Sequence, residues 1–466
     1  MTERIYLDHA AASPACRNAL SAAMPFYEEH YGSLFSPHKA GQELFSHIES
    51  ANKKIRELFG ATSDDQFVFT SSGAEASTIA IHSAYHALTK LGGKNHFVAR
   101  SIDEAPVLLA ISSLEDEGCF LKLAPTQKRG FVTKEALIEA ISPRTALVSL
   151  SWACGLTGVI QPLEELAEVC KERAIWLHVD ATHVAGKLDI SFKDLPIDIL
   201  TFSGHGLHAP VGAGGLFAKK HIPLKPLVYA SPVNVAMLMA LGESASLARE
   251  TQSLYCTEVA RLRDVFEENV LKLYPEAIRL FYDEERVPHI SALAFAGIHA
   301  ELLAFALSRK GVFASIGGTP FQSMEKVLEA CGIDPADARV PIGSNPVAKV
   351  SAFVDLHFFD SCDGIHPAPA NLSQRKLEAD GHPFRSAISL GVQFKDRSGV
   401  MLPIQSGPFR DRQAIQGGED GLESGFGGPQ AGTQHRSRLR SDQGPQFQAS
   451  VPFNDRVEKG GSGAAG

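Results

Sequence analysis

The sequence lacks several features that mark secreted, membrane-spanning and nucleic-acid-binding proteins. Its seven cysteines are scattered over 466 residues without a Cys-x-x-Cys pair. This pattern argues against a disulfide framework or a zinc site and favours reduced thiols in the cytoplasm. Lys and Arg number 44 against 53 acidic residues, and the net charge of −9 argues against nucleic acid as a partner. The opening residues do not resemble a signal peptide.

A long uninterrupted apolar run is also missing. The longest apolar stretch, residues 287–307, contains His289, His299 and Glu301, whose polar groups would be costly in lipid. We therefore expect strand, turn and helix there, and no membrane span. The chain has 44% hydrophobic and 21% charged residues, which is typical of a globular protein. Its length predicts two or three domains.

The composition changes toward the end of the chain. Thirteen of the 40 glycines fall within residues 401–466, among many Gln, Arg, Ser and Pro. Such a segment buries too little apolar surface to offset its ordering entropy, so it is predicted to be a disordered tail. We expect a large α/β domain over 15–230, a smaller α+β domain formed by 1–14 and 231–340, and a poorly defined segment over 341–400.

Between these limits, short apolar strands alternate with helices. Ile175–Val179 and Ile199–Phe202 are continuous apolar runs, as expected for strands buried on both faces, and Gln161–Arg173 is amphipathic with a helical period. Strands separated by helices predict parallel βαβ units, with ligands at the carboxyl ends of the strands. Further strands are predicted at 67–70, 146–152, 213–218 and 289–295, and further helices at 74–91, 231–273, 300–309 and 321–331.

Polar residues gather where the predicted strands end. A turn of small residues at 72–74 opens a helix, where backbone N–H groups and the helix dipole favour a phosphate, although a tight turn explains it equally well. Asp180 ends a strand, where its carboxylate can hold a cationic ring nitrogen or cap the next segment. A hydroxyl and an imidazole follow the next strand and can donate to a phosphate. The candidate site residues are Ser72, Gly73, Ala74, Asp180, Ser203 and His205.

Six segments occur in an order that is recognisable: YLDHAAASP (6–14), FTSSGAEAS (69–77), TGVIQPLEELAEVC (157–170), HVDATHVAGK (178–187), FSGHGLHAPVGAGGLF (202–217) and GVFASIGG (311–318). Together they resemble the cysteine desulfurase and class V aminotransferase family. The resemblance implies pyridoxal phosphate (PLP) as cofactor and fold type I, a mostly parallel sheet of the seven-stranded type between helices, usually in a homodimer. It also implies removal of sulfur from L-cysteine, leaving an enzyme persulfide that feeds iron–sulfur cluster assembly, with an iron–sulfur scaffold protein as partner.

The departures from the family pattern fall on residues that carry the chemistry. By this resemblance, Gly206 stands where the family has its Schiff-base lysine, and glycine cannot form an imine or move the Cα proton. Glu104 stands where a histidine stacks on the PLP ring. His183 replaces a glutamine that donates to the phenolic oxygen, and it can still donate. Further departures are Ala74, Gly155 and Val211, in place of a threonine, an asparagine and a lysine.

Three family segments are missing altogether. The glycine-rich family segment should lie between Tyr229 and Val233, where only Ala-Ser-Pro is found. After Gly318 the chain is predicted to enter a helix directly, without the mobile loop that carries the sulfur-accepting cysteine, and Cys331 is interpreted as a packing residue. The resemblance stops near Arg339, before the motif that clamps the substrate carboxylate. Because these groups act as a unit, we expect desulfurase activity to be lost.

Several functions remain open at this point. The leading hypothesis is a pseudoenzyme that keeps the fold and binds a partner or small molecule. A PLP enzyme with a non-covalent cofactor, or with the amine of Lys187 or Lys219, is a second. A metal site is a third, and a gene product altered by a frame shift after residue 340 is a fourth. The metal ligands would come from His178, Asp180, His183, His205 and His208.

Overall fold

The computed structural model of the chain describes residues 4–229, 232–295, 298–317 and 323–333, and the backbone of 351–355. The predicted tail at 401–466 lies outside the described residues, as does the segment 341–400 apart from one strand. Among the described residues, no helix is long and apolar enough to cross a membrane.

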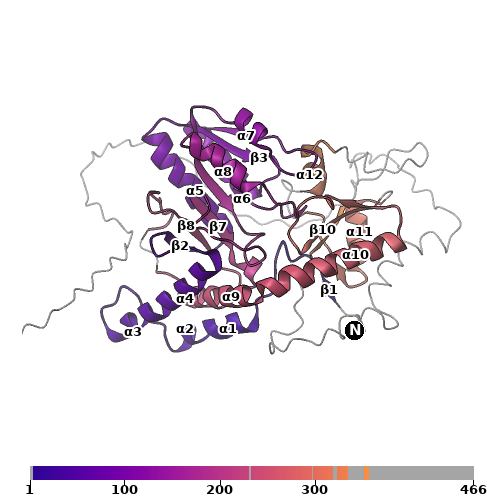
Figure 1. Cartoon of the computed structure of the whole chain (residues 1–466). Helices are drawn as coiled ribbons and strands as arrows, with labels where there is room; N and C mark the ends of the chain where they lie inside the picture. The colour runs from indigo at the N-terminus through magenta and orange to yellow at the C-terminus, as the bar shows by residue number, and fades with distance from the viewer. Residues whose placement is uncertain (1–3, 230–231, 296–297, 318–322, 334–350, 356–466) are drawn as a thin grey trace, which may run out of the picture. The chain divides into compact units, whose positions relative to one another are not determined.

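A sheet flanked by helices forms the centre of the described chain (Figure 1). It has seven strands in the order β2-β8-β7-β6-β5-β3-β4. All neighbouring pairs are parallel except those of β8, which runs antiparallel to β2 and β7. The predicted fold class is confirmed. The strands are β2 (Gln66–Thr70), β3 (His96–Arg100), β4 (Phe120–Ala124), β5 (Thr145–Ser151), β6 (Trp176–Asp180), β7 (Ile199–Ser203) and β8 (Gly214–Ala218).

Helices cover both faces of this sheet. Residues of β3 show the alternation: Phe97 and Ala99 pack with Ile81 and Ile111 on one face, while Val98 belongs to the larger core on the other. The helices on the first face are α5 (Gly73–Ala84) and α6 (Ala105–Ser112), and those contributing to the larger core include α4 (Leu44–Phe59), α7 (Lys134–Ala140), α8 (Leu163–Glu172) and α9 (Val235–Leu254).

Shorter elements surround the large sheet. Helices α1 (Arg17–Ala23) and α4 pack on α9, and α5 continues into the π-helical turn η1 (Tyr85–Lys90). The others are η2 (Glu115–Glu117), η3 (Gly204–Leu207), α2 (Pro25–Glu28) and α3 (Lys39–Gln42).

A second, smaller group of elements follows α9. The π-helical turn η4 (Tyr255–Val259) joins α9 to α10 (Ala260–Leu273), which packs on a three-stranded antiparallel sheet. That sheet comprises β9 (Ala277–Leu280), β10 (Ile290–Phe295) and β12 (Ser351–Asp355). Helices α11 (Ala300–Ser308) and α12 (Met324–Ala330) fall between β10 and β12 in the sequence.

The beginning of the chain joins this second group. Strand β1 (Ile5–Tyr6) pairs in parallel with β11 (Val312–Phe313). This pairing agrees with grouping 1–14 with 231–340, although the domain boundaries stay predictions. Cys331, which follows α12, is 2% exposed and belongs to the larger core, so its interpretation as a packing residue is confirmed.

Candidate functional site

The candidate residues meet at the carboxyl ends of β6 and β7. Asp180 is the last residue of β6 and Ser203 the last of β7, and these strands are parallel neighbours. A Cβ atom built on Gly73 would lie 3.1 Å from Ser203 Cβ, so the turn that opens α5 lies directly against the end of β7. The fold therefore brings together segments that are separated by more than a hundred residues.

The turn before α5 is arranged as a capped helix N-terminus. Ser72 caps the helix, since its Oγ accepts from the Glu75 N–H at 3.1 Å, and Glu75 Oε2 accepts from the Ser71 N–H at 2.7 Å. The N–H groups of a first turn have no acceptor within the helix. His205, in η3, contributes a buried Nδ1 without a hydrogen-bond partner among the described residues. Together these groups suit a phosphate.

Asp180 is a buried carboxylate at the centre of the site, only 7% exposed. Its Oδ1 accepts from the Thr182 N–H at 2.8 Å, and Thr182 Oγ1 in turn accepts from the Ser203 N–H at 3.2 Å. Burial raises the pKa of Asp180 to about 6 despite the bonds from Thr182. A cation placed against this carboxylate would favour its charged form, which is how a pyridinium nitrogen is held.

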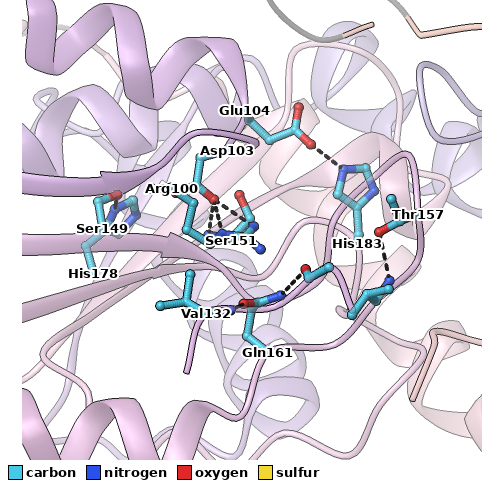
Figure 2. A network of polar contacts seen from close by, with 12 residues as sticks. Arg100, Asp103, Glu104, Val132, Ser149, Ser151, Thr157, Gln161, His178 and His183 are labelled. Carbon is cyan, nitrogen blue, oxygen red and sulfur yellow. Dashed lines mark hydrogen bonds and ion pairs between the residues drawn. The ribbon is translucent and has the colours of Figure 1, made fainter. Parts of the chain in front are cut away.

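Glu104, Gly155 and His183 form one packed group near Asp180. The contact between Glu104 and His183 is shown in Figure 2. His183 Nε2 donates to Glu104 Oε1 at 3.1 Å. A Cβ atom on Gly155 would lie only 2.4 Å from His183 Nε2 and 3.0 Å from Glu104 Oε1, so the glycine provides the space for this pair. Burial alone would lower the pKa of His183, but the bond to Glu104 and the charges of Glu104 and Asp180 raise it.

The two lysines considered as amines lie at opposite edges of the sheet. Lys187 is 4% exposed and donates from Nζ to the Gly206 carbonyl oxygen, so it is not a solvated surface lysine. Lys219 follows β8, whose antiparallel register pairs Ala218 with Ile199 at the start of β7. Lys219 therefore lies at the far edge of the sheet, where its Nζ donates to the Phe192 carbonyl oxygen at 2.6 Å.

Comparison with known proteins agrees with this architecture. The model of the family described as aminotransferase class V matches residues 5–233. A cysteine desulfurase of Gluconacetobacter diazotrophicus is 33% identical over 323 residues, covering 67% of this chain and 80% of the relative. One of Cereibacter sphaeroides is 34% identical over 325 residues, covering 68% and 82%.

This chain belongs to the cysteine desulfurase family. Solved structures show the same relation: a NifS-like protein, 25% identical, superposes with a TM-score of 0.69 over 76% of this chain and 94% of its own. The structure of SspA in complex with cysteine superposes with a TM-score of 0.63 at 23% identity, over 76% and 98%, which bears on the fold alone. The family uses PLP, and the turn before α5 and the buried Asp180 suit that group.

The metal hypothesis does not agree with the geometry. His178 is fully buried, with Nδ1 2.8 Å from Ser149 Oγ (Figure 2). Its Nε2 lies 2.8 Å from Thr201 Oγ1, so both ring nitrogens are engaged. Burial lowers its pKa to about 3. Over the described ranges, no group of three or more His, Cys, Asp or Glu side chains is placed to hold a metal ion. His178 is therefore a structural residue.

Three supporting residues escaped the sequence analysis. Arg100 and Asp103 form a fully buried ion pair, 2.7 Å between Nη2 and Oδ1, and Asp103 Oδ1 also accepts from the Ser151 N–H at 2.9 Å (Figure 2). In the sequence, this ion pair was indicated only by two opposite charges three residues apart. Thr182 links Asp180 to Ser203, and the Asp-x-Thr pattern of an Asx-type turn would have indicated it.

Proposed function

We propose that this chain binds PLP at the carboxyl ends of β6 and β7 and does not release sulfur from L-cysteine. The single observation that carries the binding proposal is the convergence of the 72–74 turn, His205 and Asp180 on one site. The turn suits the phosphate, as does His205 Nδ1, which has no hydrogen-bond partner among the described residues, and Asp180 suits the ring nitrogen. His183, held by Glu104, can donate to the phenolic oxygen of the ring.

PLP, when bound, supplies an aldehyde and an electron-withdrawing ring. The chain's own residues orient and charge that ring. Asp180 holds a proton more readily than an ordinary carboxyl, because burial raises its pKa, so a bound pyridinium would draw that carboxyl into its ionised form. The buried Arg100–Asp103 pair fixes the end of β5 through Ser151, which is the strand partner of Asp180 in β6, so it is a positioning element.

We propose the loss of sulfur transfer because the described cysteine thiols lack the properties of a sulfur acceptor. A sulfur-accepting cysteine needs a lowered pKa and access to solvent. Among the cysteines that the structure describes, burial raises the pKa of Cys119, Cys154, Cys170, Cys256 and Cys331, and only Cys256 is not fully buried. The sulfur of Cys16 instead caps α1, accepting from the Ala19 N–H at 3.4 Å.

The test is a titration of the full chain with PLP, followed by absorbance and equilibrium dialysis, beside an assay for sulfide released from L-cysteine. Wild type should bind PLP and release no sulfide, while a family desulfurase run in parallel does. Asp180→Asn should weaken PLP binding about tenfold or more, because a charged hydrogen bond is lost. The matched control Asp189→Asn, on an exposed carboxylate, should bind normally. Absence of PLP binding, or sulfide release at the desulfurase rate, would contradict the proposal.

Binding of a second copy of the chain is a second candidate function, as in the family homodimer. Large apolar side chains that are 40–78% exposed gather on α1, α2, the loop before α3, and α4: Leu20, Met24, Tyr27, Tyr31, Phe35 and Phe45. A surface of this kind is typical of protein interfaces. Sedimentation of wild type and of Tyr31→Ser/Phe35→Ser tests it: a wild-type dimer that dissociates in the variant supports this interface, and a wild-type monomer contradicts it. An iron–sulfur scaffold partner and a cytoplasmic location stay predictions.

A further inference from the structure

Lys187 is held in an unusual place for a lysine. It lies in the turn after β6, where its backbone N–H donates to the Val184 carbonyl at 2.9 Å and its carbonyl accepts from Cys256 Sγ at 2.6 Å. The side chain is 4% exposed, and Nζ donates to the Gly206 carbonyl oxygen. Burying a lysine is costly unless its amine is hydrogen-bonded, and here the Gly206 carbonyl is such a partner.

The amine of Lys187 lies beside the position of the missing family lysine. A Cβ atom built on Gly206 would lie 3.6 Å from Lys187 Nζ, with no side chain of residue 206 between that amine and the site. The same Cβ would approach the Thr182 carbonyl oxygen to 2.9 Å, so the η3 loop is built around a glycine. The space next to residue 206 is thus reached by an amine from another element.

The electrostatic neighbours of Lys187 place it within the site. Its positive charge lowers the pKa of His205 and opposes the raised pKa of His183, so the amine lies near both imidazoles. Burial and the charges of His183 and Lys187 lower the pKa of His205 to about 4, so that ring is neutral at pH 7. Lys219, by contrast, stacks its Nζ 4.2 Å from the Phe192 ring centroid at the far edge of the sheet.

We propose that Lys187, from the turn after β6, supplies the amine that forms an imine with the aldehyde of PLP in place of a lysine at residue 206. The inference rests on the proposed PLP site. The reaction is a condensation without redox change: the ammonium nitrogen gives up two hydrogens, which leave with the aldehyde oxygen as water, and the C=N bond forms. The protonated imine keeps one N–H, which can still donate to the Gly206 carbonyl.

The experiment uses the full wild-type chain incubated with PLP, reduced with borohydride, digested and mapped by mass spectrometry. The expected result is a yellow absorbance band before reduction and a phosphopyridoxyl group on the peptide containing Lys187. Lys187→Arg keeps the charge and a donor for the Gly206 carbonyl but cannot form an imine. It should lose the adduct and bind PLP about tenfold more weakly or worse. Lys219→Arg is the matched control and should keep the adduct on Lys187.

The outcomes separate this inference from the proposed function. PLP that is retained on dialysis without a reduced adduct, or with adducts spread over exposed lysines such as Lys171 and Lys220, overturns the role of Lys187 and leaves the proposed binding site intact. No retention of PLP overturns both. Because the mapping is done on wild type, the result does not depend on whether a variant folds.

Discussion

Substituting Gly155 by alanine tests whether Glu104, Gly155 and His183 act as one packed unit. In the structure, a Cβ atom at residue 155 would lie 2.4 Å from His183 Nε2 and 2.7 Å from its Cε1. Carbon atoms in good contact are about 3.5–4.0 Å apart, so the imidazole must swing by about 1 Å or more. The ring can do so only by giving up the 3.1 Å bond to Glu104.

The expected cost follows from two opposing effects. Loss of a buried hydrogen bond to a charged group costs about 1.5–3 kcal/mol. Replacing glycine by alanine at a position without a positive φ restores about 0.4–1 kcal/mol, because the unfolded chain loses conformational freedom. The φ of Gly155 is not in the positive range, so the net destabilisation of Gly155→Ala should be about 1–2 kcal/mol.

The assay is urea unfolding of four proteins: wild type, Gly155→Ala, His183→Ala and the double variant. With the imidazole removed, the added methyl group has space, so Gly155→Ala should be neutral or stabilising by up to about 1 kcal/mol in that background. NMR titration provides a second readout: the pKa of His183, which the bond to Glu104 raises, should fall in Gly155→Ala.

Equal destabilisation by Gly155→Ala in both backgrounds would refute this reasoning, as would an unchanged pKa of His183. Either result would mean that the glycine is required by the backbone and not by the pair. The departures at these three positions would then be independent of one another.

Three further perturbations test the surrounding polar groups. Glu104→Gln should lower the pKa of His183. A histidine with a raised pKa stabilises the fold at pH values below its unfolded pKa of 6.5, and this contribution is lost as pH rises through the raised pKa. Glu104→Gln should therefore destabilise the fold more at about pH 6 than at about pH 9. Asp103→Asn leaves the fully buried guanidinium of Arg100 uncompensated, so the unfolding free energy measured in urea should fall by about 3–5 kcal/mol; a change within about 1 kcal/mol would mean the pair is not buried in solution. The pKa of His178 is lowered to about 3, so the fold loses stability as pH falls below 6.5, by about 2 kcal/mol at about pH 5. His178→Phe should lose correspondingly less unfolding free energy between neutral pH and about pH 5. An unchanged dependence of the unfolding free energy on pH would contradict this.

The central strands were predictable because they are buried on both faces. β6 and β7 read as continuous apolar runs, and the structure places them within one residue or two of the expected ranges. β4 was not assigned, because it lies at the sheet edge and mixes Lys122 with the 60% exposed Phe120. β3 was missed for a related reason: its apolar run is short and ends in Arg100, whose burial depends on Asp103.

The candidate site was predicted in part. Residues 72–74, Asp180, Ser203 and His205 lie close together because the carboxyl ends of parallel strands meet at one edge of a sheet. Lys219 was wrong as a site residue, because β8 is antiparallel and carries it to the opposite edge. Thr182 was missed, because its two bonds depend on how the turn after β6 meets β7.

The sequence by itself determined the family, the alternation of strands and helices, and which family residues are replaced, since these depend only on residue order and local periodicity. Only the tertiary structure decided which of the replaced family positions contact one another. Gly155 and Glu104 are distant in the chain, yet both contact His183, and Lys187 reaches the backbone of Gly206 from a different loop. Such contacts are set by the crossing of chain segments at the end of the sheet. For that reason, Gly206, which the sequence indicates as the site of a lost lysine, lies next to the buried amine of Lys187 in the fold.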